Sequence, residues 1–296
     1  MDERAVLTEQ FEEHRPHLRA VAYRMLGSVS EADDAVQEAW LRLDRADTGE
    51  VQNLGGWLTT VVARVCLNML RSREHRREDP LEVQLTDPAV GPDAGPDAGG
   101  DPEQEMLLAD EVGLALLVVL DTLAPAERVA FVLHDMFAVP FDEIAPLLDR
   151  SPAATRQLAS RARRRVKGGT PAPDADLTRR RRVVDAFLAA TRGGDFEALL
   201  ALLDPDVVLR ADKWVVPTPE PILVTGAHPV AKGAMAAMGR ARFTGPALLN
   251  GTVGLVMAPH GRLRLVLDFT ITDDRITEIA ISAAPATLRN LEVAVL

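Results

Sequence analysis

The stretch from Pro140 to Lys167 constrains this chain more than any other, because it has the pattern of two short helices joined by a tight turn. In the first half, apolar residues recur at i, i+3, i+4 and i+7, which predicts a helix with one buried face. The turn occupies 149–151, where Ser151 is a suitable N-cap and Pro152 a suitable first residue of the next helix. The stretch is therefore predicted to be a helix-turn-helix; its first apolar face comprises Phe141, Ile144, Ala145 and Leu148.

The second helix of this motif is basic on one side. We expect it to bury Leu158, Ala162 and Val166, and no acidic residue occurs between Ala153 and Lys167. A recognition helix needs small or hydrogen-bonding residues near its start, where it meets base edges, and cations further along, where the phosphates run. The alternative is an amphipathic helix with a solvated basic face, but the turn and the polar N-terminal half favour DNA. The predicted DNA-binding face comprises Thr155, Arg156, Gln157, Ser160, Arg161 and Arg164.

The length and charge of the chain limit its domain organisation and its mode of DNA binding. A chain of 296 residues predicts two or three domains. The formal net charge is −11, so DNA binding must be confined to local basic patches, with help from a larger partner. The single cysteine, Cys66, excludes an internal disulfide and lies in an apolar helical run, as a structural thiol would. We find no signal-peptide pattern or apolar run long enough to cross a bilayer, and we expect a soluble, cytoplasmic protein without metal or cofactor.

The first seventy residues predict three helices. The helix expected over 6–26 contains Pro16, which would bend or break it. The helix expected over 31–43, with Ser30 as its cap, has an acidic face that includes Asp33, Asp34, Gln37 and Glu38; solvent exposure explains that face as well as a partner does. The helix expected over 57–73 mixes apolar positions with hydrogen-bonding and basic ones, a composition suited to single-stranded DNA. Its candidate DNA-binding residues are Arg64, Asn68 and Arg71.

Three blocks carry a family resemblance. EADDAVQEAWLRL (31–43), GGWLTTVVARVCLNMLRSR (55–73) and LAPAERVAFVLHDMFAVPFDEIAPLLDRSPAATRQLASRARRRV (123–166) resemble, in order and spacing, an extracytoplasmic-function sigma factor of the sigma-70 family. The resemblance implies that the helix over 31–43 docks on the clamp of core RNA polymerase. It also implies that residues 53–73 melt and read the −10 element of promoter DNA, and that the helix-turn-helix reads the −35 element. The implied polymerase-binding residues are Asp33, Asp34, Gln37, Glu38 and Trp40.

The expected organisation is multidomain. Residues 1–73 would form the sigma region 2 domain and 105–167 the region 4 domain, both all-α. Between them, 74–104 is an acidic linker rich in proline and glycine, which serves either as a passive tether or as a segment threading the RNA exit of polymerase. A second linker, 168–177, leads to a third domain over 178–296.

The third domain changes from helical to strand periodicity. Helices are expected over 179–192, 196–203 and 230–239, strands over 207–212, 250–257, 263–269 and 275–281, and turns at His260-Gly261 and Asp273-Asp274. Helices followed by a curved antiparallel sheet predict an α+β conical barrel with one pocket. The run FLAATRGGDFEALLALLDPDVVLRAD (187–212) resembles SnoaL-like domains, which extend a subgroup of these sigma factors. Two of that subgroup's motifs are absent here: Trp-Leu-Pro-Glu-Pro in the linker, and Asp-Gly-Gly-Gly-Lys, where this chain reads Asp212-Lys213-Trp214.

The function implied is promoter-specific transcription initiation, modulated by the SnoaL-like domain. The alternative is a DNA-binding module fused to a small-molecule-binding or isomerase-like domain. Isomerases of that superfamily use a buried aspartate with a tyrosine or a protonated acid, but the only tyrosine, Tyr23, lies in the first domain. We therefore expect no enzyme activity and no catalytic residue. An unknown small ligand remains a candidate partner of the pocket, whose polar candidates are Asp212, His228, His260 and Asp268.

Overall fold

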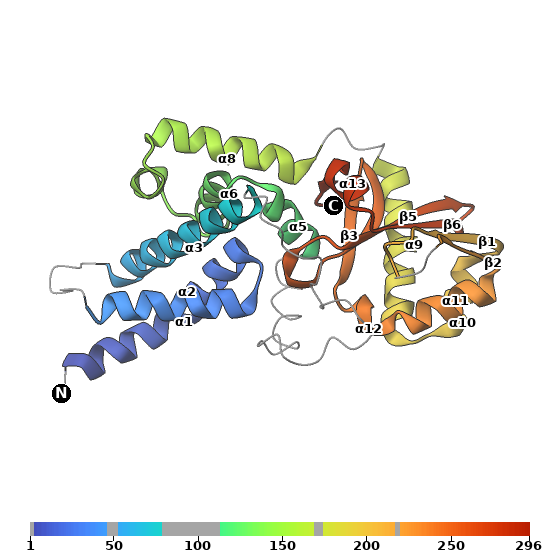
Figure 1. Ribbon diagram of the computed structural model, residues 1–296, viewed down its shortest axis with the longest axis horizontal. Helices are drawn as coiled ribbons and strands as arrows, with labels where there is room; N and C mark the ends of the chain where they lie inside the picture. The colour runs from blue at the N-terminus through green and yellow to red at the C-terminus, as the bar shows by residue number, and fades with distance from the viewer. Residues whose placement is uncertain (1–2, 46–52, 79–112, 169–173, 217–219) are drawn as a thin grey trace. The chain divides into compact units, whose positions relative to one another are not determined.

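The computed structural model describes residues 3–45, 53–78, 113–168, 174–216 and 220–296. These residues divide into two compact units (Figure 1). The first comprises the described residues up to 78 together with 123–162. The second comprises 113–122 together with 163–296. The predicted linker 74–104 and the expected start of the next helix lie mostly outside the described residues.

The first unit is helical. α1 (Glu3–Leu26), α2 (Val29–Leu43) and α3 (Leu54–Glu78) pack on one another, and α1 runs through Pro16 without a break. Gly27, at φ 74°, ends α1, and the next residue, Ser28, accepts a hydrogen bond from the backbone N–H of Glu31. The expected cap at Ser30 is thus wrong by two residues. Ser28 and Glu31 have the spacing of a capping box, and that arrangement starts the helix at Val29.

The helix-turn-helix follows in the same unit. α6 (Pro125–Phe131) continues as a π-helical turn, η1 (Val132–Met136). After it come α7 (Phe141–Ile144), the 3₁₀ turn η2 (Ala145–Leu147) and α8 (Pro152–Lys167). Asp149 adopts φ 53° in the tight turn, and Ser151 Oγ accepts a hydrogen bond from the N–H of Ala154 at 3.2 Å. The predicted turn and N-cap are therefore confirmed.

The second unit is built on one seven-stranded sheet in the order β2-β1-β6-β5-β4-β3-β7. β1 runs parallel to β6 and every other pair is antiparallel. The strands are β1 (Leu203–Ala211), β2 (Ile222–Thr225), β3 (Thr244–Leu249), β4 (Thr252–Met257), β5 (Leu265–Thr272), β6 (Arg275–Ser282) and β7 (Val293–Ala294).

Helices cover the sheet of the second unit. α9 (Asp174–Gly193) packs on β3 and β4 and leads into α10 (Phe196–Leu202); α11 (Ala227–Ala236) and α12 (Met238–Ala241) complete that layer (Figure 1). Their core with the sheet includes Val184, Phe187, Leu199, Leu255 and Phe269. The remaining turns are η3 (Pro259–Gly261) and α13 (Pro285–Asn290). The predicted architecture, all-α modules followed by an α+β domain, is confirmed.

α5 (Leu114–Thr122) is grouped with this sheet although it precedes the helix-turn-helix in sequence. Its residues 114–120 are all apolar, and the helix packs on β3, β7 and β4. Side chains alternate across a strand, so Thr244 of β3 points toward the α9 layer while Gly245 meets α5. The nearest atom to a Cβ built on Gly245 is the Cβ of Leu114.

Candidate nucleic-acid interface

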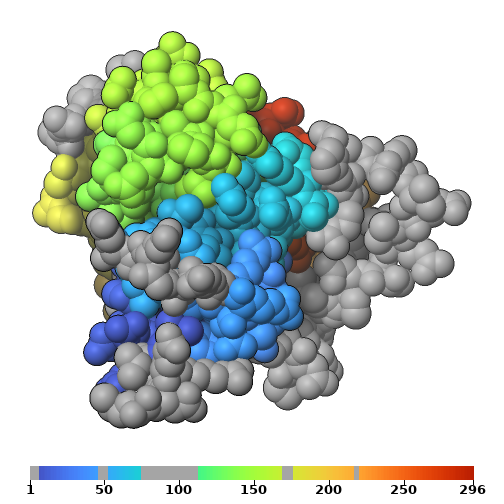
Figure 2. Space-filling view, turned by 90° about the vertical axis from the view of Figure 1, so that its left-hand side faces the viewer, coloured from blue at the N-terminus to red at the C-terminus, as the bar shows by residue number. Residues whose placement is uncertain are grey.

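α8 exposes most of the residues predicted to bind DNA. Its exposed residues form a face along the helix, and its buried positions are Thr155, Ala159 and Ala162. Figure 2 shows the helix-turn-helix segment, in green, as an open surface with part of α3, in light blue, beside it. The exposed candidates are Arg156, Gln157, Ser160, Arg161 and Arg164.

Thr155 is the exception among the α8 candidates. It has no exposed surface, and its hydroxyl donates to the carbonyl of Ser151 at 3.0 Å. The side chain thus closes the first turn of the helix instead of facing outward. The expected buried face was also misplaced, because Leu158 and Val166 are only half-buried while Thr155 and Ala159 are fully buried. The small residues allow α8 to approach its neighbours closely.

Two arginines of α8 are already positioned by the protein. The Arg156 guanidinium lies 5.3 Å from the centre of the Phe141 ring, on the preceding helix. Arg161 Nε lies 2.7 Å from an oxygen of Glu127, whose side chain is 11% exposed. Arg161 thus neutralises a nearly buried carboxylate, so its role is partly structural. Gln157, Ser160 and Arg164 have no side-chain hydrogen bond or ion pair with any described residue.

α3 brings Arg64, Asn68 and Arg71 together on one exposed face at i, i+4 and i+7. The opposite face, including Leu58, Val62 and Cys66, is buried. None of the three exposed side chains pairs with another described residue. Arg73 differs from them: it forms an ion pair with Glu31 and donates to the Leu26 carbonyl, so it ties α3 to α1 and α2.

α2 exposes Asp33, Asp34 and Gln37, while Glu38 and Trp40 are half-buried. Asp33 pairs with Arg19 of α1 at 2.7 Å, and Glu38 pairs with Arg42 one turn along α2. The Trp40 ring packs on Phe11, with ring centres 5.0 Å apart. The acidic residues of this face are therefore available to a partner, whereas Trp40 is partly covered by Phe11.

The first unit also contains contacts that the sequence did not suggest, between α1 and the segment from α6 to Phe137 that precedes the helix-turn-helix. The buried Arg128 of α6 donates to the Met25 carbonyl at 2.9 Å, and the Phe137 ring stands edge-on to His17 at 5.3 Å. The Arg24 guanidinium lies 5.2 Å from the centre of the same phenyl ring. A signal for Arg128 was present: Glu127 and Arg128 interrupt an otherwise apolar helical run.

The polar pocket candidates of the third domain do not line its cavity. Asp212 accepts hydrogen bonds from the backbone N–H groups of Trp214, Ala283 and Ala284, at 2.8–2.9 Å, and so pins two loops. Asp268 is exposed on β5, and His260 lies in a turn at φ 54°. None of these three candidates, nor His228, is among the described residues that line the cavity.

Two helical modules, one with a helix-turn-helix and one with an exposed acidic face, define a protein of the sigma-70 class. Sigma-70 region 2 matches residues 10–76, and sigma-70 region 4 matches residues 113–166. ECF RNA polymerase sigma factor SigJ of Mycobacterium tuberculosis strain H37Rv is 44% identical over 209 residues, 69% of this chain and 64% of SigJ. The probable ECF RNA polymerase sigma factor SigI of the same strain is 40% identical over 202 residues, 67% of each chain. The chain belongs to the extracytoplasmic-function sigma factors of the sigma-70 family.

Among solved structures, the crystal structure of M. tuberculosis SigJ is 35% identical, with a TM-score of 0.45, covering 95% of this chain and 98% of that chain. The sequence match to SigJ spans just under two thirds of that relative's length. Within the described residues, no helix combines the length and apolarity needed to cross a bilayer.

Proposed function

We propose that this chain directs core RNA polymerase to promoters and that its C-terminal domain modulates that activity through α5. In this proposal the exposed acidic face of α2 binds core polymerase. Arg64, Asn68 and Arg71 of α3 contact the −10 element, and the exposed face of α8 contacts the −35 element. Thr155 is left out of this set because it is buried. The proposal places the chain in the cytoplasm, where polymerase works on the chromosome.

The observation that carries the regulatory part is the position of α5. The region 4 match begins at residue 113, yet its first helix packs on β3 and β7 of the C-terminal sheet. The end of α8 is tied to the same unit, because the Val295 N–H donates to the Val166 carbonyl and Arg165 donates to the Thr122 carbonyl, both at 3.1 Å. Any change in the sheet around β3 therefore acts directly on a helix of region 4.

A second restraint on promoter binding lies inside the first unit. The two promoter elements are about 25 base pairs apart, roughly 85 Å along straight duplex at 3.4 Å per base pair. A compact body of about 100 residues has a radius of gyration of only about 13 Å. α3 packs directly on α6, and Arg128 ties α6 to the end of α1. The first unit must therefore open before α3 and α8 can engage both elements, and we propose that core polymerase stabilises the open form.

Reconstituted transcription tests this proposal. The full-length chain would be added to purified core polymerase with a library of promoter fragments, and specific transcripts would be sequenced. We expect transcripts that start at a fixed distance from a shared two-part motif. A matched variant, Asp33→Asn with Asp34→Asn, should lower binding to core polymerase while leaving the chain folded, because both carboxylates are exposed. Failure of the full-length chain to bind core polymerase would overturn the proposal.

A further inference from the structure

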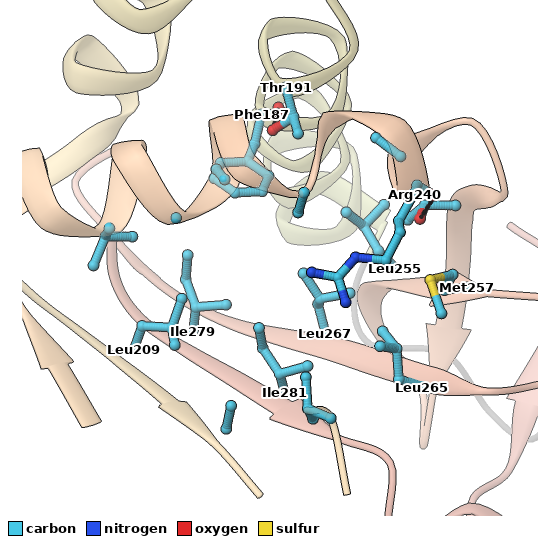
Figure 3. Close-up of a pocket in the computed structure, with 18 of the residues that line it drawn as sticks. Phe187, Thr191, Leu209, Arg240, Leu255, Met257, Leu265, Leu267, Ile279 and Ile281 are labelled. Atoms are coloured by element: carbon cyan, nitrogen blue, oxygen red, sulfur yellow. Dashed lines mark hydrogen bonds between the residues drawn. The ribbon is translucent and has the colours of Figure 1, made fainter. Parts of the chain in front are cut away.

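A cavity of about 250 Å³ lies inside the second unit, between the α9–α12 layer and the sheet (Figure 3). Its lining is overwhelmingly apolar and comes from helices on one side and from strands β1 to β6 on the other. An apolar cavity of about 150 Å³ is enough to hold benzene, so this one has room for a larger apolar group. Representative lining residues are Phe187, Leu209, Leu255, Leu267, Ile279 and Ile281.

Three polar side chains line the cavity within the described residues: Thr191, Thr244 and Arg240. The Thr191 hydroxyl donates to the Phe187 carbonyl at 2.9 Å, and the Thr244 hydroxyl donates to the Arg240 carbonyl at 3.2 Å. Both hydroxyl protons are therefore committed to the backbone. The N–H groups of Arg240 are the remaining side-chain donors of this lining.

Arg240 is placed to meet an anion. Its side chain runs from α12 toward Leu267 and Leu255, and its guanidinium has no hydrogen bond or ion pair with any described residue (Figure 3). The backbone that carries it is anchored: Arg192 donates to the carbonyls of Ala241 at 3.1 Å and Thr244 at 2.6 Å. No carboxylate belongs to the described lining, so the positive charge at this wall is not compensated.

We propose that this cavity binds a medium-chain apolar monocarboxylate, with the hydrocarbon part inside and the carboxylate on Arg240. A planar guanidinium binds a carboxylate through two parallel N–H···O bonds, which fixes both its distance and its orientation. A neutral ligand would leave the guanidinium unpaired, and a cationic ligand would be repelled by it. The apolar walls exclude a ligand that is polar throughout.

The chemistry of this lining favours binding of a ligand rather than catalysis. General acid–base catalysis requires a group that exchanges protons near neutral pH within reach of the ligand. The described lining has no carboxylate, imidazole, thiol or phenol. The cavity thus provides a surface of fixed shape and charge, suited to sensing a ligand.

The cavity and α5 share two strands. Thr244 and Met257 form a register pair that lines the cavity, and the next pair along, Gly245 and Val256, faces the opposite side of the sheet. Leu114 of α5 packs against Gly245. A ligand in the cavity would therefore contact the same two strands, β3 and β4, that hold α5, a helix of region 4. This consequence for transcription rests on the function proposed above, whereas the binding site itself does not.

Binding is tested on the full-length chain by calorimetry with decanoate below its micelle concentration, beside decanol and decylamine. We expect saturable, one-to-one binding of decanoate, at least tenfold weaker binding of decanol and no binding of decylamine. Arg240→Gln should weaken decanoate binding at least tenfold and change decanol binding less than threefold. The matched control is Arg242→Gln, because Arg242 is stacked on Phe243 and does not line the cavity. It should bind decanoate like the parent chain.

Three results would overturn the site. One is the absence of decanoate binding to the parent chain. Another is equal binding of decanol and decanoate. The third is unchanged decanoate binding in Arg240→Gln, or in Ala234→Phe, which narrows the cavity from α11. Arg240 is exposed and has no described structural partner, so its variant should keep the thermal unfolding temperature of the parent chain. Calorimetry does not involve polymerase, so a failure here is distinct from a failure in reconstituted transcription.

Discussion

A Cβ atom on Gly245 would stand 3.2 Å from the Cβ of Leu114, so the two backbones approach as closely as they do because position 245 has no side chain. This contact joins β3 of the C-terminal domain to the first helix of region 4. Glycine is used here for close approach, since its backbone is not in the left-handed region. Substitution of Gly245 therefore tests directly whether the C-terminal domain affects region 4 through α5.

Gly245→Ala should loosen α5 from the sheet. The added methyl group requires a shift of a few tenths of an ångström, and overpacking of this kind costs about 1–3 kcal/mol. We expect faster hydrogen exchange in residues 114–122 and a changed rate of transcription at a fixed promoter. The control is Gly239→Ala, where a Cβ would meet nothing within 4 Å. Unchanged exchange in α5 would show that the sheet does not hold this helix through Gly245.

Arg156→Ala should weaken promoter binding by the holoenzyme. Loss of one base contact costs about 1–3 kcal/mol, or roughly 5- to 150-fold in affinity, with the largest effect at one position of the −35 element. Titration of labelled promoter variants measures this. Arg181→Ala is the control, since Arg181 lies on α9 and pairs with Asp185 there. Equal affinity of Arg156→Ala and parent across all promoter variants would remove Arg156 from the reading face.

Arg161→Ala should have a compound effect, because Arg161 neutralises the nearly buried Glu127. Removing the cation leaves that carboxylate unpaired, which is costly in a buried site. We expect both weaker promoter binding and lower stability, whereas adding Glu127→Gln should restore stability but not binding. Denaturation midpoints and promoter titrations of the single and double variants separate the two effects. A stability loss that the double variant does not recover would contradict this reading.

Arg128→Met should favour the open form of the first unit. The substitution keeps the length of the side chain but removes the hydrogen bond to the Met25 carbonyl, and an unsatisfied buried acceptor costs about 1–3 kcal/mol. We expect faster hydrogen exchange in α6 and tighter binding of promoter DNA by the chain without polymerase. Arg15→Met is the control, because Arg15 is an exposed arginine of α1 that pairs with Glu12 one turn away. Weaker or equal DNA binding by Arg128→Met would contradict a closed, self-restrained unit.

Local chemistry explains which parts of the fold could be predicted. The turn and cap at 149–152 depend on neighbouring residues, so they were predicted correctly. β3 was missed because Asn250-Gly251 was placed inside a strand, although both residues adopt positive φ and form the hairpin turn between β3 and β4. The burial of Thr155 and the packing of α5 depend on distant segments, and helical periodicity alone does not reveal which neighbour covers which face.

The exposed faces of the helices could likewise be predicted from local spacing, whereas the contacts of single side chains with distant segments could not. Exposed charges on α2, α3 and α8 could be predicted because amphipathic spacing separates them from the core. The pairing of Arg161 with Glu127 is a tertiary contact, and it is likewise the tertiary structure that leaves the Arg240 guanidinium without a hydrogen bond or ion pair to any described residue. The polar residues considered as pocket candidates were chosen for their chemistry, but none of them lines the cavity within the described residues. Asp212, for example, is occupied by three backbone N–H groups.

The stability of the first unit should fall as the pH drops below about 6.5, in part because of His17. Burial lowers the pKa of His17 from its ordinary value of 6.5, and the nearby His14 and Arg24 lower it further. Between the folded and unfolded pKa values the unfolded chain binds more protons, so the free energy of unfolding rises with pH. The His17 contribution is thus fully present above pH 6.5 and is lost as the pH falls through the folded-state pKa.

Denaturant titrations from about pH 8 to pH 5 should show a shallower pH dependence in His17→Gln than in the parent chain. That variant keeps a polar group for Thr59 Oγ1, 3.3 Å from His17 Nε2. A pH dependence that is identical in the two chains would mean that protonation of His17 does not oppose the contact between α1 and Phe137.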